Sequence, residues 1–125
     1  MIQVHIAFIL YLFAGLTTLA GMAALLPRPL VTRFLPLTGL GTEGWFFVRH
    51  WAVLVVVCGA LLGWAARDAS VRPTVLSLVA FEKYFFSGLV YSRRGTPLFR
   101  ALWPSAAADL VAALVLTFYV YRSCQ

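Results

Sequence analysis

The chain has 125 residues and a formal charge of +6; 62% of its residues are hydrophobic and 11% are charged. A soluble domain carries about 25% charged residues, so this composition and the mean hydropathy of +0.91 indicate a membrane protein, and the length allows one domain. The positive charge does not indicate nucleic-acid binding, because the chain has no soluble basic domain and no exposed platform that interleaves aromatic and basic residues.

Four apolar segments follow one another along the chain, each close to the roughly 20 residues that cross a bilayer as a helix. They must be helical, because the bilayer offers backbone amides no other hydrogen-bond partner. We therefore expect an all-α fold: a polytopic membrane protein whose single domain, residues 1–125, is a four-transmembrane-helix bundle. The expected helices cover about residues 2–26, 45–66, 73–91 and 98–121.

The connection between the first two expected helices, residues 27–44, is apolar for a loop and contains three prolines and two arginines. Such a segment does not extend into water as an ordinary polar loop does. It is interpreted as an interfacial connector, with a lid over an internal cavity as the alternative.

The distribution of arginine predicts the orientation in the membrane. Four crossings place both termini on one side, and the two connections on the opposite side are richer in arginine. That opposite side is flanked by Arg28, Arg33, Arg93, Arg94 and Arg100, and the side of the termini by Arg67, Arg72 and Arg122, with Asp68 offsetting them. The positive-inside rule then places the two arginine-rich connections in the cytoplasm and both termini outside. The membrane that we expect is the bacterial inner membrane, with the termini in the periplasm.

Small residues mark where helices can approach closely. Gly59 and Gly63 form a GxxxG pattern in the second expected helix, and small residues surround Asp109 in the fourth. The latter are Ser105, Ala106, Ala107, Ala108, Ala112 and Ala113. Because small side chains let helix backbones pack closely in lipid, we interpret both patterns as packing surfaces, within this chain or between copies.

Five ionisable residues lie inside the expected helices, where a charge costs at least a few kcal/mol and usually marks function. Glu82 and Lys83 lie near the middle of the third helix, Asp109 near the middle of the fourth, and Arg49 and His50 just inside the second. With 1.5 Å per residue, Glu82 and Asp109 lie roughly 15 Å deep and Arg49 and His50 roughly 6–8 Å deep. We therefore expect these residues to converge in one charge-balanced cluster within the bundle.

The cluster suggests roles for its members. Glu82, Asp109 and His50 are the candidate acid–base residues, and Arg49, Lys83 and the adjacent Trp51 are candidate ligand-binding residues. Glu82 and Lys83 are neighbours about a hundred degrees apart on the helix, so they cannot both face the same partner. The alternative is that the charges only lock the register and pairing of the helices.

Other chemistries fit the sequence less well. A metal held by His50, Glu82 and Asp109 would be repelled by the nearby cations, so no metal is predicted. His5 and His50 lie near opposite membrane surfaces and cannot share a haem. The chain has no P-loop and no paired redox cysteines, and no cofactor is identified.

One run of residues resembles a known pattern. It comprises Arg49-His50-Trp51, Gly59-Ala60-Leu61-Leu62, Ala65-Ala66, Arg72-Pro73 and Glu82-Lys83. Over about residues 45–90 the chain is similar to small bacterial four-helix membrane proteins of the DoxX-like group. The resemblance implies a four-helix bundle.

Two functions follow as hypotheses. The first is an integral membrane protein whose charged pocket binds, and can transform by acid–base chemistry, a lipophilic small molecule or lipid. The second is a non-catalytic accessory subunit of a larger membrane complex, in which the buried charges are structural. Either protein has the lipid bilayer as a partner and can form a homo-oligomer.

Overall fold

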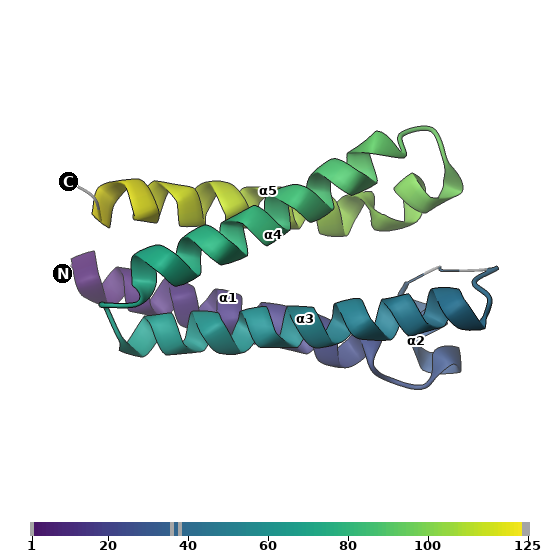
Figure 1. Cartoon of the computed structure of the whole chain (residues 1–125), viewed down its shortest axis with the longest axis horizontal. Coiled ribbons are helices and arrows are strands. Elements are labelled where there is room, and N and C mark those ends of the chain that lie inside the picture. The colour runs from purple at the N-terminus through teal and green to yellow at the C-terminus, as the bar shows by residue number, and fades with distance from the viewer. Residues whose placement is uncertain (1, 36, 38, 124–125) are drawn as a thin grey trace.

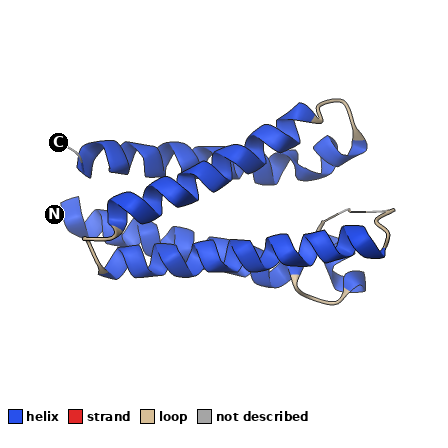
Figure 2. Cartoon of the chain, viewed as in Figure 1, coloured by secondary structure: helices blue, strands red, loops and turns tan. Residues whose placement is uncertain are grey.

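The computed structural model describes residues 2–35, 37 and 39–123, with side chains from residue 5 onward. Within this part of the chain there are helices and loops and no strand (Figure 2), so the all-α expectation is confirmed. The helices are α1 (Ile2–Ala24), α2 (Arg28–Phe34), α3 (Thr42–Arg67), α4 (Arg72–Ser92) and α5 (Pro97–Ser123). The four expected segments correspond to α1, α3, α4 and α5, and α2 is an additional short helix within the connection 27–44.

The helices form two layers, and each layer is an antiparallel pair (Figure 1). α1 packs along α3, and α4 packs along α5, whereas the two pairs meet mainly where α4 passes α3. Both termini lie at one end of the molecule, and α2 and the α4–α5 connection lie at the other (Figure 1).

The hydrophobic core occupies the end of the molecule that holds the termini. Its most buried members come from all four long helices: Leu10, Leu62, Leu76, Val79 and Leu116, each at most 1% exposed. Val75 and four alanines complete the cluster, and the small alanine side chains let the backbones lie close; the alanines are Ala14, Ala65, Ala66 and Ala80. The core cluster thus joins all four long helices at this end of the bundle.

Glycine allows α1 and α3 to approach closely. A Cβ placed on Gly59 would meet the side chain of Thr18 and lie 3.0 Å from the Thr18 backbone nitrogen. A Cβ on Gly21 would lie 2.8 Å from the carbonyl oxygen of Ala52. The GxxxG pattern therefore packs within this chain, as one of the two interpretations predicted. At Gly63 the contact is looser, since a Cβ placed there would lie 3.9 Å from the Cβ of Ala14.

The α3–α4 connection is held by polar bonds to the end of α3. The Arg72 side chain donates from Nε to the carbonyl oxygen of Ala65 at 2.7 Å and from Nη2 to that of Ala66 at 3.0 Å. These carbonyls are among the last four of α3, which lack helical partners. Within the turn, Asp68 accepts bonds from the hydroxyl and backbone N–H of Ser70, which hold the Asp68 pKa below its ordinary value.

We expect Arg72→Met to lower the free energy of unfolding by roughly 1.5–3 kcal/mol, because hydrogen bonds from a charged donor to partly buried carbonyls contribute about this much. Arg67→Met is the matched control. Within the described part of the chain, Arg67 donates only to the exposed Tyr11 hydroxyl, at 3.3 Å, so its replacement should change stability by less than about 0.5 kcal/mol. Denaturant titrations in detergent micelles measure both variants. Equal losses would show that the bonds of Arg72 to α3 do not stabilise the turn.

Three of the described helices are long and apolar enough to cross a membrane: residues His5–Ala24, Thr42–Arg67 and Pro97–Ser123. The structure is thus compatible with a membrane protein. α4 is not among them, although it has 21 residues. The physical reason is that Glu82 and Lys83, side by side at its centre, lower its mean hydropathy.

Candidate functional site

A cavity of about 360 Å³ lies between the two helix layers, in the half of the molecule away from the packed core. All five helices contribute to its wall. Most of the lining is apolar, and Lys83 and Asp109 are the only charged residues among the described ones that line it. We call this space the central cavity.

The central cavity exists because two facing helices carry small side chains at helical spacing. α5 lines it with Ser105, Ala108 and Ala112, and α1 lines it with Thr17 and Ala20. Residues spaced by three, four or seven lie on one helix face, so these positions leave a continuous strip without bulk. Large side chains then enclose the strip: Phe13, Trp51 and Phe86.

The expectation that small residues around Asp109 serve close packing holds for only part of the set. Ala106 and Ala113 are buried against neighbouring helices, as expected. Ser105 and Ala108 are exposed and line the central cavity. The cavity is therefore open along the side where α1 and α5 carry exposed lining residues, which include Leu16 and Ala20 on α1.

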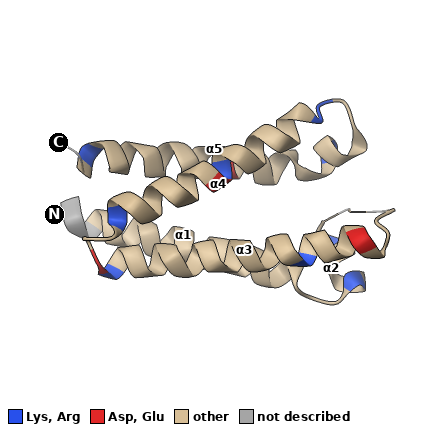
Figure 3. Cartoon of the chain, viewed as in Figure 1, with Lys and Arg blue, Asp and Glu red and all other residues tan. Residues whose placement is uncertain are grey.

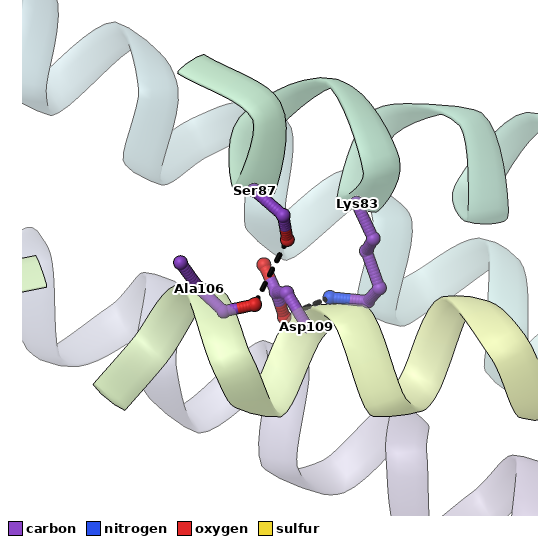
Figure 4. A network of polar contacts seen from close by, with 4 residues as sticks. All are labelled: Lys83, Ser87, Ala106 and Asp109. Carbon is purple, nitrogen blue, oxygen red and sulfur yellow. Dashed lines mark hydrogen bonds and ion pairs between the residues drawn. The ribbon is translucent and has the colours of Figure 1, made fainter. Parts of the chain in front are cut away.

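An ion pair between α4 and α5 forms the polar part of the wall. Lys83 Nζ lies 2.7 Å from Asp109 Oδ1, and the two side chains are 5% and 25% exposed, respectively. One turn further along α4, the Ser87 hydroxyl donates to the carbonyl oxygen of Ala106 at 2.9 Å. Figure 4 shows both contacts bridging the same helix pair. The charge-assisted bond is short, and each partner neutralises the other at the cavity surface.

Trp51 joins α3 to this wall. Its indole stacks on the Phe86 ring, with centroids 5.5 Å apart and planes at 23°. Its Nε1–H is buried and has no hydrogen-bond partner among the described residues. Trp51 lines both the central cavity and a neighbouring apolar groove that also includes Leu35 and Phe86. The structure thus places this predicted ligand-binding residue at the cavity.

The short helix α2 covers the end of the central cavity. Val31 is 1% exposed, and with Phe34 and Leu35 it contributes apolar side chains to the lining. The guanidinium carbon of Arg28 lies 5.4 Å from the Trp45 ring centroid, which ties the start of α2 to the start of α3. Of the two interpretations of segment 27–44, this position corresponds to a cover over an internal space.

The expected cluster of five charged residues is not formed. Arg49 and His50 have exposed side chains and do not line the central cavity. Glu82 is half-buried and receives no hydrogen bond or ion pair from the described residues. The reason is angular: α4 turns Lys83 toward α5, so its neighbour Glu82 points about a hundred degrees away. Figure 3 shows blue and red ribbon segments next to one another where α4 passes α5, with most other charged residues near the helix ends.

Of the predicted site residues, Lys83, Asp109 and Trp51 therefore line one cavity, whereas Glu82, Arg49 and His50 lie outside it. Among the described residues, no three His, Cys, Asp or Glu side chains are grouped so that they could hold a metal ion. Sequence reasoning missed Thr17 and Phe86 as lining residues. Their positions carry no signal beyond helical periodicity, whereas the spacing of Ser105, Ala108 and Ala112 is visible in the sequence.

Comparison with known proteins returns no relatives: no family model, no curated protein and no solved structure matches this chain. The resemblance to the DoxX-like group over residues 45–90 stays a prediction.

Proposed function

We propose that this protein is an integral membrane protein that crosses the bilayer four times and binds a lipophilic small molecule in the central cavity. The observation that carries the proposal is the cavity itself: an apolar space of about 360 Å³, open beside α1 and α5, with an ion pair in its wall. Ligand sites typically have 300–1,000 Å³ and combine an apolar lining with a few polar groups.

The proposal that α4 also crosses the membrane is supported by the outward face of this helix. Leu78, Phe81, Phe85 and Leu89 form a stripe with exposures between 53% and 69%. Such a row of large apolar side chains is unfavourable in water and favourable against lipid. On the inward face, Lys83 is compensated by Asp109, which lowers the cost of carrying a charge at membrane depth.

The number of crossings has a direct test. The background is a variant with Cys58 and Cys124 changed to Ser. Cells with a permeabilised outer membrane and an intact inner membrane are treated with a membrane-impermeant maleimide, and we expect Ser70→Cys to react. Thr96→Cys should react only after the inner membrane is broken, since α4 separates residue 70 from residue 96 and the arginine-rich end faces the cytoplasm. Labelling of both cysteines from the same side would rule out the crossing by α4.

Filling the central cavity should abolish binding. We expect Ala108→Phe to reduce capture of co-purified lipophilic molecules by more than about tenfold, because the added ring occupies the space that a ligand needs. Ala108 already borders open space, so thermal stability should change little. Mass spectrometry of organic extracts of the purified protein measures what is retained.

Val111→Phe is the matched control on the same helix. Val111 is 61% exposed and does not line the central cavity, so the same added ring should leave retention unchanged. Equal retention by wild type, Ala108→Phe and Val111→Phe would show that the cavity is not the binding site.

The second candidate, a non-catalytic accessory subunit, is favoured by one observation: the charges of Lys83 and Asp109 already neutralise each other across the α4–α5 contact. In that case the sole role of the ion pair is to join α4 to α5. Purification in mild detergent separates the two functions. A stoichiometric protein partner, together with empty organic extracts, would favour the subunit and overturn the ligand-binding proposal.

A further inference from the structure

This inference rests on the proposed function and concerns the kind of molecule that the central cavity accepts. We propose that the cavity selects an uncharged amphiphile, whose polar head is a hydroxyl or carbonyl oxygen placed beside Lys83 and Asp109, and that it discriminates against carboxylate and ammonium heads.

Among the described residues, the wall of the central cavity contains one cation and one anion, and they are paired with each other. Lys83 Nζ and Asp109 Oδ1 are 2.7 Å apart, and no other charged residue lines the described cavity. The polar wall therefore has no net charge. An anionic or cationic head brought into this apolar space would lose its hydration and find no unpaired opposite charge, which is strongly unfavourable. An uncharged head avoids that cost.

The wall of the central cavity also has hydrogen-bond donors and acceptors that the described contacts do not use. An ammonium has three N–H donors and a carboxylate has two acceptor oxygens, yet the described contacts join only Lys83 Nζ to Asp109 Oδ1. Thr17 and Ser105 also line the cavity, and neither hydroxyl makes a hydrogen bond with the described residues. A head that contains oxygen can use these groups, whereas a pure hydrocarbon would leave them all unsatisfied.

The central cavity has one polar wall and one apolar end. From the level of the ion pair, the lining continues over apolar side chains toward α2, where Val31, Phe34 and Leu35 close the end. The opening lies between exposed positions of α1 and α5, so a ligand can enter from the surrounding lipid. A single polar head with an apolar tail matches one polar wall and one apolar end.

The test uses four probes with the same chain: dodecanol, dodecanoate, dodecylammonium and dodecane. A dodecanol that carries a diazirine is photocrosslinked to the full-length protein in nanodiscs near neutral pH, and mass spectrometry locates the labelled residues. The unlabelled probes then compete at matched concentrations in the membrane. We expect dodecanol to compete at roughly tenfold lower concentration than each of the other three, the factor that one hydrogen bond to a charged partner provides.

Three variants sharpen the test. Lys83→Met leaves the charge of Asp109, so dodecylammonium should become the best competitor. Asp109→Asn leaves the charge of Lys83, so dodecanoate should become the best competitor. The reversed pair, Lys83→Asp with Asp109→Lys, restores neutrality and should restore the preference for dodecanol. Ser87→Ala is the control, because Ser87 bridges the same helices without lining the central cavity.

The outcomes separate this inference from the proposed function. If no probe competes and labelling is scattered over lipid-facing residues, the proposed function fails and the inference fails with it. If labelling is confined to the central cavity but charged heads compete as well as dodecanol, only the selection of an uncharged head is overturned. The wild-type ranking decides the question even where a variant does not fold.

Discussion

Asp109→Asn is expected to lower the free energy of unfolding by about 3–5 kcal/mol, because it leaves the Lys83 ammonium buried without its counter-charge. Lys83 is 5% exposed and lies at the centre of α4, so neither water nor the membrane surface can replace the lost carboxylate. The reciprocal change, Lys83→Met, should cost less. Asp109 is 25% exposed at the cavity wall, so its carboxylate is less completely buried than the Lys83 ammonium and loses less when its partner is removed.

The double variant Lys83→Met, Asp109→Leu is the informative control. Replacing a whole buried pair by apolar side chains of similar size is often neutral or stabilising. We therefore expect its stability to lie within about 1 kcal/mol of wild type, and a double-mutant cycle completed with the single variants Lys83→Met and Asp109→Leu then gives the coupling between the two residues. Unfolding in mixed detergent micelles provides the values. A loss in the double variant equal to the sum of the single losses would mean that the two charges do not interact.

Gly59→Val is the second change with a large expected effect, and it tests the α1–α3 contact. The new Cβ would first meet the Thr18 hydroxyl, and behind it lie backbone atoms of α1, with the Thr18 nitrogen at 3.0 Å and the Ala14 carbonyl oxygen at 3.1 Å. Backbone cannot rotate away as a side chain can, so α1 must shift. Overpacking usually costs about 1–3 kcal/mol, and we expect Gly59→Ala within that range and Gly59→Val above it.

Gly63→Ala provides the comparison within the same GxxxG pattern. Its new methyl group would meet only Ala14 Cβ, at 3.9 Å, an ordinary van der Waals distance. Alanine also favours helix over glycine by roughly 1 kcal/mol, so this variant should be as stable as wild type or slightly more stable. Thermal unfolding of both variants in the same detergent measures the difference. If Gly63→Ala were the more damaging change, the close approach at Gly59 would be disproved.

The sequence predicted the positions of the long helices well because both signals that define them are local. Apolar runs interrupted by proline and charge predicted helices over 2–26, 45–66, 73–91 and 98–121, and α1, α3, α4 and α5 begin and end near these residues. The short helix α2 was not predicted, because a seven-residue segment that itself contains Pro29 carries no clear periodicity. Its position over the cavity depends on contacts from elsewhere in the chain.

The candidate site was predicted only in part. The depth of a residue along a helix follows from its number. Depth correctly suggested that Asp109, on the last helix, could reach a charged residue on α4. The partner is Lys83, not the expected group of five. Direction around the helix axis decides this, and a hundred degrees separates Lys83 from Glu82. Sequence does not reveal which direction faces a neighbouring helix when both flanks of α4 carry apolar residues.

The amino-acid sequence by itself therefore determined the all-α class of this protein, its long helices and the residues whose charge conflicts with an apolar setting, because each of these properties is set by the composition of a single segment. Only the tertiary structure decided that Lys83 meets Asp109, that Gly59 rather than Gly63 is in close contact with α1, and that a cavity remains between the layers. These features depend on how helices rotate and tilt against one another, and that arrangement is settled by the packing of the whole bundle.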